Sequence, residues 1–212
     1  MRRDYLHGRL DESSAPRGWL EQFQLWFADA SADPAITEVN AMQVATVGAD
    51  GCPSVRTVLL KGLDERGVVF YTNFDSAKAH DLDSKPQAAA VFAWLAHERQ
   101  VRISGPVSRV EQEQTDAYFA SRPRGSQIGA WASPQSSVIS SRASLEAAVA
   151  EIEARFAGMQ VPTPPGWGGF RIAPQTVEFW QGRADRLHDR LRYRSDLAGG
   201  AEGGWAIERL AP

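Results

Sequence analysis

The chain has 212 residues, of which 43% are hydrophobic and 23% are charged, as in an ordinary soluble globular domain. Its 23 basic and 26 acidic side chains give a net charge of −3, so a global electrostatic footprint for nucleic acid is absent and any anion site must be a local cluster. A single cysteine, no apolar run of the roughly 18 residues that span a bilayer, and no secretion signal predict a cytoplasmic protein without an internal disulfide or a membrane span.

The first part of the chain combines one helix with short strands. Polar residues 1–16 predict a mobile N-terminal arm, and residues 17–212 are expected to form a single domain because no linker divides them. Apolar residues at helical spacing predict an amphipathic helix over 17–30. Strands are expected over three stretches: Ala41–Val47, 55–61 and 68–72. The turns between these strands are too short for a parallel crossover, so they predict an antiparallel meander.

The rest of the chain mixes strands and helices. A helix is expected to open at Asp75 or Ser76 and to end before Pro86. Further helices are expected over 111–121 and 140–156, with a Pro/Gly-rich loop over 161–169. Further strands are expected over 88–95, 99–110, 170–172, Thr176–Gln181, 191–194 and Trp205–Arg209. Many short strands interrupted by a few helices predict a mainly β fold, a closed or nearly closed barrel with helices packed outside.

The strand expected at 55–61 carries two cations. Because side chains alternate along a strand, Arg56 and Lys61 are expected on opposite faces. Two cations on opposite faces are poorly placed to grip one phosphate. Either they serve two different anions or one of them is merely solvated, and the spacing leaves both interpretations open.

Two further segments combine cations with hydroxyl groups. Around Lys78, a strand passes through a polar turn into a helix start, where Ser76, the ammonium group and backbone N–H groups suit an anion, although an ordinary capped helix has the same pattern. Around Tyr118 and Arg122, a phenol, guanidinium groups and a hydroxyl suit a phosphate. Arginines at a helix C-terminus are also favourable through the helix dipole alone, so both interpretations stay open.

The segment 179–190 contains three arginines, a histidine and two large aromatic residues. This mixture suits a planar, anionic, aromatic ligand, because rings offer a packing surface and guanidinium groups bind phosphate. The arginines that flank His188 are expected to lower its pKa by like-charge repulsion and keep it neutral. The four histidines are dispersed without HxxxH or HxH spacing, so no metal site is expected.

Several segments follow one another in a specific order along the chain. They are residues 56–61 (RTVLLK), 70–73 (FYTN), 76–80 (SAKAH), 98–101 (ERQV), 121–131 (SRPRGSQIGAW), 167–171 (WGGFR), 177–182 (VEFWQG), 186–190 (RLHDR) and 208–212 (ERLAP). One such segment is weak evidence, but the ordered set is highly specific and covers nearly the whole chain. In these segments the chain resembles the pyridoxine (pyridoxamine) 5′-phosphate oxidase family.

The resemblance implies an FMN-binding split β-barrel that works as a homodimer, with FMN bound between subunits. It also implies oxidation of pyridoxine 5′-phosphate or pyridoxamine 5′-phosphate to pyridoxal 5′-phosphate, with O2 reoxidising the flavin to give H2O2. By position, contacts to FMN are implied for Arg56, Thr57, Val58, Leu59, Leu60, Lys61, Tyr71, Thr72, Lys78, Gln100, Gln135, Ser136, Trp180 and Arg190. Contacts to the substrate are implied for Arg2, Tyr5, Lys61, Tyr118, Arg122, Ser126, Arg186, Leu187 and His188. Our hypothesis is that Arg186 and His188 are the catalytic pair.

One departure from the family pattern affects the cofactor. Ala77 stands where many members carry an arginine before the lysine, so we expect weaker FMN retention rather than lost activity. Two other functions compete with the oxidase. A split-barrel flavin or deazaflavin reductase is disfavoured by the residues implied to hold a substrate phosphate, and a non-catalytic pyridoxal phosphate or flavin carrier is disfavoured by Arg186 and His188.

Overall fold

The computed structural model describes residues 8–195 and 204–212. Arg2 and Tyr5 lie outside the described residues, so their implied substrate contacts stay predictions. Within the described part of the chain, no helix is both long enough and apolar enough to cross a bilayer.

Strands dominate the structure, which confirms the mainly β prediction. The strands are β1 (Ala41–Val47), β2 (Pro53–Leu59), β3 (Gly62–Asp64), β4 (Gly67–Asn73), β5 (Gln87–Trp94), β6 (Arg99–Arg109), β7 (Trp167–Ile172), β8 (Thr176–Gln181), β9 (Asp189–Ser195) and β10 (Trp205–Arg209). The helices are α1 (Trp19–Ala32), α2 (Ala77–Ser84), α3 (Gln112–Ser121), α4 (Arg124–Ala132) and α5 (Arg142–Arg155), with 3-10 turns η1 (Leu95–His97) and η2 (Ala184–Arg186).

The strands form one sheet, ordered β10-β9-β8-β6-β5-β1-β2, to which β3, β4 and β7 are joined. All its strand pairings are antiparallel, as expected from the short turns. The long β6 serves both parts, because residues 99–104 pair with β8 and residues 107–109 pair with β7. Between these stretches lies Gly105, where a Cβ atom would lie 1.9 Å from the Ala173 carbonyl oxygen. Only glycine fits this close approach.

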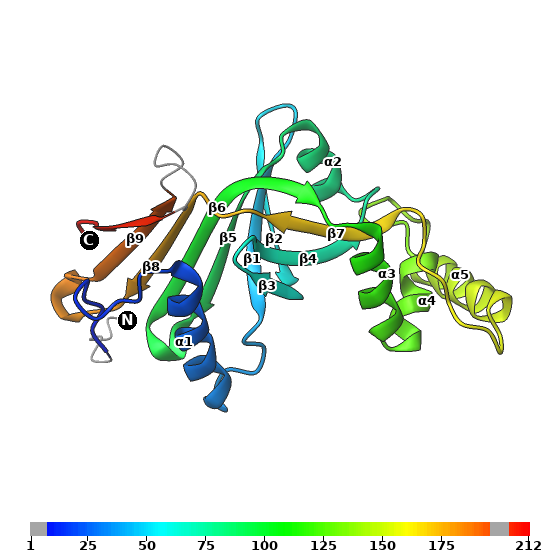
Figure 1. Cartoon of the computed structure of the whole chain (residues 1–212). Coiled ribbons are helices and arrows are strands. Elements are labelled where there is room, and N and C mark those ends of the chain that lie inside the picture. Colours follow the sequence, from blue (N-terminus) through cyan, green and yellow to red (C-terminus); the bar gives the residue numbers. More distant parts are fainter. Residues whose placement is uncertain (1–7, 196–203) are drawn as a thin grey trace.

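The main core lies between the sheet and α1. Strand β1 alternates buried and half-buried residues, as a strand with one core face should. From α1, the Phe23 ring lies 4.9 Å from Phe92 of β5, and the Trp26 ring lies 5.3 Å from Phe179 of β8. Figure 1 shows α1 on this side of the sheet and α3, α4 and α5 gathered at the other end of the molecule, where Phe119, Ile128, Phe156, Val161 and Trp167 form a second, smaller core.

The end of β2 corrects a prediction about the two cations. The strand stops at Leu59, and the Lys61 N–H donates to the Val69 carbonyl of β4 rather than to β1. The alternation of side chains therefore ends before Lys61. Lys61 lies outside β2, so the two faces of that strand no longer describe the pair, and both residues line the same cavity.

Two other segments differ from expectation. Residues 167–169, expected as the end of a loop, form the start of β7 and pair with residues 71–73 of β4. Helix α4 was not expected at all, and it directly follows α3 after Pro123. Both segments pack against Phe119 and its neighbours, so tertiary packing decides their structure more than local sequence does.

Candidate ligand-binding site

A cavity of about 380 Å³ opens where β2, β4, β7, α2 and α3 approach one another. Its lining, which we call the cavity cluster, consists of Arg56, Thr57, Val58, Leu59, Lys61, Tyr71, Thr72, Lys78, Tyr118, Arg122, Gln135 and Trp167. All of these residues except Trp167 are site residues named from the sequence. The structure therefore brings together residues from β2, β4, α2 and α3 that lie far apart along the chain.

Lys78 is buried in the cavity cluster, with 9% of its surface exposed. Its Nζ donates to Gln135 Oε1 at 2.8 Å, to Thr72 Oγ1 at 2.9 Å and to Ser76 Oγ at 3.2 Å. Burial, helped by the charge of nearby Arg56, lowers the pKa of Lys78 to about 8. These three acceptors are neutral oxygens and leave the positive charge uncompensated, so this corner of the cavity attracts an anion.

Arg56 is held in place by groups behind the cavity. Its Nη1 donates to Thr46 Oγ1 at 2.6 Å, and the Thr46 hydroxyl donates to Asp81 Oδ2 at 2.6 Å. Further hydrogen bonds run from Nη1 to the Val44 and Ser54 carbonyls, both at 3.1 Å. Burial lowers the pKa of Arg56, partly offset by Asp81. The guanidinium is therefore a fixed cation beside Lys78 rather than a mobile surface group.

Three aromatic rings form a nearly parallel stack in the cavity. The Tyr71 ring centroid lies 4.1 Å from Tyr118 and 5.3 Å from Trp167, with interplanar angles of 22° and 12°. Arg122 lies over the Trp167 ring, with its Cζ 4.7 Å from the centroid. Burial lowers the pKa of Arg122 and raises the pKa of the Tyr118 phenol. The stack thus presents flat apolar rings, with the Arg122 cation over one of them.

One nitrogen of Arg122 lacks a partner. Within residues 8–195 and 204–212, its Nη1 is buried and has no hydrogen-bond acceptor. A buried donor on a charged group is costly to leave unsatisfied. An anionic oxygen from a ligand in the cavity would satisfy it, and this is the single feature of the site that points most directly to a bound anion.

Three of the residues named from the sequence lie beside the cavity cluster without lining the cavity. Leu60 is buried in the main core at 8% exposure. Ser126, in the first turn of α4, and Ser136, next to Gln135, are both exposed. Ser136 has a φ of 71°, in the left-handed region that a non-glycine residue seldom adopts.

A second set of named residues lies on the outer face of the sheet. Gln100 of β6 is opposite Trp180 of β8, which is opposite Arg190 of β9. The neighbouring row on these strands is fully buried on the core face, so the Gln100 row faces away from the core. Arg190 Nε donates to the buried Glu178 Oε1 at 2.8 Å, which fixes the guanidinium beside Trp180.

His188 packs beside this row. Its ring centroid lies 4.6 Å from that of Trp180, and its Nδ1 accepts the Arg183 backbone N–H at 3.1 Å. Burial, then the nearby Arg186 charge, lowers the pKa of His188, so the ring is neutral near pH 7. Because Nδ1 is an acceptor, the ring proton lies on Nε2, which is a hydrogen-bond donor.

Arg186 and Leu187 are both exposed on the connection from β8 to β9. Asp185 and Arg186 have φ values of 54° and 63°, two consecutive non-glycine residues in the left-handed region. Such a backbone costs about 1 kcal/mol or more per residue and persists where surrounding contacts impose it, often at functional sites. We call Gln100, Trp180, Arg186, His188 and Arg190 the hairpin cluster.

The two clusters occupy different parts of the chain. No hairpin-cluster residue lines the cavity, among the residues that the structure describes. Figure 1 places β8 and β9 at one end of the molecule and α3 at the other, with β2 and β4 between them. One copy of the chain therefore does not gather all the residues named from the sequence around one ligand.

Sequence reasoning did not assign site roles to two residues. Trp167 completes the aromatic stack. It was not named because it stands beside Gly168 and Gly169, in a segment that was expected to be a loop. Glu178 is 7% exposed and accepts from both Arg102 and Arg190, which makes it the buried carboxylate that holds the hairpin cluster. A lone glutamate in a strand carries no sequence signal for this function.

Known proteins are similar to this chain along its whole length. A family profile described as pyridoxamine 5′-phosphate oxidase matches residues 28–156, and one described as pyridoxine 5′-phosphate oxidase C-terminal dimerisation region matches residues 167–212. A pyridoxine/pyridoxamine 5′-phosphate oxidase from Saccharopolyspora erythraea is 58% identical, over 100% of this chain and 94% of that protein. One of the same name from Burkholderia cenocepacia is 53% identical, over 100% and 97%.

Solved structures are similar as well. PhzG from Burkholderia lata, in complex with tetrahydrophenazine-1-carboxylic acid, is 32% identical with a TM-score of 0.86, covering 94% of this chain and 95% of that one. A pyridoxamine 5′-phosphate oxidase-related, FMN-binding protein from Nostoc punctiforme has 18% identity and a TM-score of 0.72, covering 94% and 99%, and so shares the fold.

Proposed function

This chain belongs to the pyridoxamine 5′-phosphate oxidase family, and from that premise we propose that it oxidises pyridoxine 5′-phosphate or pyridoxamine 5′-phosphate to pyridoxal 5′-phosphate. FMN is the proposed cofactor, and O2 is the proposed final acceptor, released as H2O2. The observation that supports this most is the cavity cluster, which sets cations, one with an unpartnered buried nitrogen, beside a flat aromatic stack.

The donor set of the cavity fits the phosphate of FMN. Lys78 and Arg56 are adjacent, rigidly held cations, and Thr72 and Gln135 add a hydroxyl and an amide that already contact Lys78. We assign these residues, together with residues 56–61, to the cofactor. When bound, FMN supplies a two-electron acceptor for hydride from the substrate.

The substrate phosphate is assigned to Arg122 and also to Lys61, which is thus assigned to both ligands. Lys61, Tyr118 and Arg122 line the cavity, and Ser126 lies in the first turn of α4. The free Arg122 Nη1 offers a charge-assisted hydrogen bond to a phosphate oxygen. Binding energy gained at this remote phosphate holds the rest of the substrate in the orientation that the reaction needs.

Arg186 and His188 are the proposed catalytic residues. A neutral His188 presents Nε2–H as a donor to the alcohol or amine of the substrate, and Arg186 adds a permanent positive charge beside it. Their role is to orient the carbon that is oxidised.

A complete site is proposed to need two copies of the chain. The hairpin cluster, apart from Gln100, lies inside the region matched by the dimerisation profile, residues 167–212. We propose that the cavity cluster of one copy faces the hairpin cluster of the other in a homodimer. FMN and the substrate would then be bound between the two subunits.

The absorbance spectrum of the purified protein, followed by anaerobic addition of pyridoxine 5′-phosphate, tests this function. We expect a yellow flavin band that bleaches on addition and returns, with H2O2, when air is admitted. A flavin band that pyridoxine and pyridoxamine phosphates leave unbleached contradicts the proposal. A carboxylated tricyclic substrate, of the kind bound by PhzG from Burkholderia lata, or a flavin reductase would then be tested by the same bleaching assay. Bleaching without any peroxide would favour another acceptor.

A further inference from the structure

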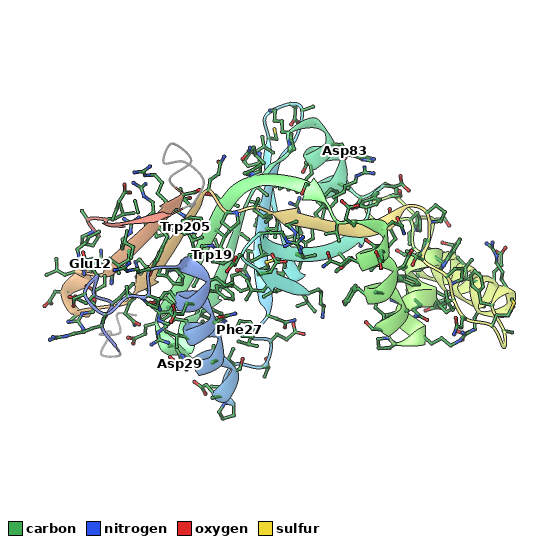
Figure 2. The ribbon with its side chains drawn as sticks, in the orientation of Figure 1. Glu12, Trp19, Phe27, Asp29, Asp83 and Trp205 are labelled. Carbon is green, nitrogen blue, oxygen red and sulfur yellow. The ribbon has the colours of Figure 1, made fainter. Side chains whose placement is uncertain are left out.

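The last residues of the chain, 208–212, belong to the ordered set of segments but have no role in the proposed site. Arg209, on β10, is the most highly connected of them. Its Nε donates to Glu12 Oε1 at 2.6 Å, its Nη2 to Glu12 Oε2 and to the Leu10 carbonyl at 3.1 Å, and its Nη1 to Asp189 Oδ1 at 2.9 Å. One guanidinium therefore joins residues 10–12, the start of β9 and the C-terminal strand. Figure 2 shows Glu12 at the same end of the molecule as this strand.

Asp189 links Arg209 to the connection between β8 and β9. Besides Arg209, its carboxylate accepts the Leu10 backbone N–H at 3.2 Å and lies 3.6 Å from Arg183 Nε. Arg183 also donates from Nη1 to the Gly8 carbonyl at 2.8 Å. Asp189 therefore closes the connection at one end while Arg183 holds it at the other.

The same connection sets the state of His188. The Arg183 backbone N–H is the group that donates to His188 Nδ1. His188 directly precedes Asp189, so the ring is held between two residues whose side chains are joined to each other. Moving Asp189 would move both ends of the turn that fixes the ring.

Ordinary surface ion pairs contribute little to stability, and Arg209 and Glu12 are 39% and 42% exposed. The arrangement is more than such a pair, because the guanidinium engages two carboxylates and a carbonyl from two distant segments. The contacts converge next to His188 and reach the main core only at the backbone of Leu10. Because the Arg209 side chain is itself partly exposed, we expect its loss to affect the geometry of the site more than unfolding.

We propose that Arg209 is a positioning residue that acts through Asp189 to fix the tautomer and orientation of His188. The catalytic consequence rests on the proposed function, whereas the effect on the His188 ring does not. The contact from Arg190 Nη1 to the Ala211 carbonyl, 2.8 Å, and that from the Leu210 N–H to the Arg190 carbonyl, 2.9 Å, do not involve the Arg209 side chain. Losing that side chain should therefore spare Arg190 and the FMN contact assigned to it.

The test compares Arg209→Gln, Arg209→Lys and Glu12→Gln in the full-length holoenzyme. For Arg209→Gln we expect kcat/KM for pyridoxine 5′-phosphate to fall about tenfold to a hundredfold, the loss that a small misplacement of a catalytic group produces. FMN affinity and the melting temperature should stay near wild type. Arg209→Lys keeps the positive charge but lacks the planar guanidinium that makes several hydrogen bonds at once, so it should restore part of the rate. Glu12→Gln, which keeps the arginine and its Asp189 contact, should give a smaller loss.

The control is Arg194→Gln, which removes an arginine of β9 that contacts Glu208 at 3.1 Å and that forms neither a hydrogen bond nor an ion pair with Asp189 in the described part of the chain. It should leave the kinetics unchanged. A second readout needs no activity: ring nitrogen NMR, assigned with His188→Asn, should show the Nε2–H tautomer in wild type and a mixed tautomer in Arg209→Gln. An unaltered His188 signal in that variant overturns the proposal, as does a rate loss no larger than that of the control. A wild-type protein without oxidase activity but with the expected NMR change would reject the proposed function alone.

Discussion

Lys78 is the residue whose surroundings most change its chemistry. Its pKa is about 8 instead of 10.5, because burial penalises the ammonium and Arg56 repels it. Below pH 8 the protonated side chain attracts a phosphate. Above pH 8 the free protein loses that charge, so phosphate binding must take up a proton and weakens with rising pH. Burial raises the pKa of the Tyr71 and Tyr118 phenols, so neither phenol loses its proton in the pH range where Lys78 does.

Between about pH 7 and 8 the phosphate, whose second pKa is about 6, is already a dianion, so we expect the Kd of FMN to be flat there. Above pH 8 the Kd should rise, by up to about tenfold per pH unit, the limit for one linked proton. Lys78→Met should bind FMN more weakly and lose this pH dependence. Fluorescence titration of the apoprotein with FMN across the range measures both. A wild-type Kd that does not change with pH would show that Lys78 does not contact the phosphate.

Arg122 differs from Lys78 in having a buried nitrogen without a hydrogen-bond acceptor, among the residues that the structure describes. Replacing it with methionine removes both the costly buried donor and the proposed phosphate contact. Arg122→Met should therefore raise the KM for substrate about tenfold to a hundredfold, the worth of a charge-assisted hydrogen bond, while the melting temperature stays level or rises.

Arg124 provides the matched control for Arg122. It is two residues away, and its guanidinium donates to the Met159 and Phe156 carbonyls at 2.9 and 2.8 Å. Arg124→Met should therefore lower the melting temperature and leave KM unchanged. Steady-state kinetics and thermal unfolding of both variants check this reciprocal pattern. A KM that rises equally in both would mean that Arg122 has no special contact with the substrate.

At the scale of elements, the start of α2 decides how well the cofactor phosphate is held. Helix N-termini favour anions, and Ala77 is the exposed first residue of α2, directly before the buried Lys78. An arginine there would add a cation at the end of the helix that already attracts the phosphate. Ala77→Arg should tighten FMN binding by about tenfold, near the lower limit for one charge-assisted hydrogen bond. Ala77→Met, of similar length but uncharged, should not, and an unchanged Kd in the arginine variant would refute the expectation.

Elements with strong periodicity were predictable, and elements defined by close packing were not. Strand β1 follows alternation closely, and helix α1 follows helical spacing. Strand β7 begins with Trp167 and two glycines, which look like a loop by sequence. At Gly168 a Cβ atom would lie 2.4 Å from Phe74, so that glycine serves close packing instead of a turn. Helix α4 contains Gly125 and Gly129, which lower helix propensity, and it is held by Ile128 in the smaller core.

Site residues followed the same division. Arg56, Lys78 and Arg122 could be named from the sequence because the ordered segments contain them, and the structure gathers them in one cavity. Asp81, which supports Arg56, and Glu178, which supports Arg190, could not be named, because a carboxylate that fixes an arginine from another element leaves no local pattern.

The whole molecule raises the question of how the cavity and hairpin clusters meet. Figure 1 separates β8 and β9, which carry most of the hairpin cluster, from the end of the molecule where α3 lies. If the clusters meet across a twofold axis, each dimer has two sites, and every site draws one cluster from each copy. Variants defective in different clusters should then complement one another.

Two variants test this complementation when they are co-expressed: Arg122→Met in the cavity cluster and Arg186→Leu in the hairpin cluster. Each homodimer should have low kcat/KM, since both of its sites carry the same defect. Random mixing makes half the dimers mixed, and each mixed dimer has one site free of both changes and one site with both. Co-expressed subunits should therefore recover about a quarter of wild-type activity, the statistical limit for two sites related by a twofold axis. Sites built within one chain would recover nothing, because every copy would keep its own defect. Two affinity tags isolate the mixed dimer, in which recovery should reach about half.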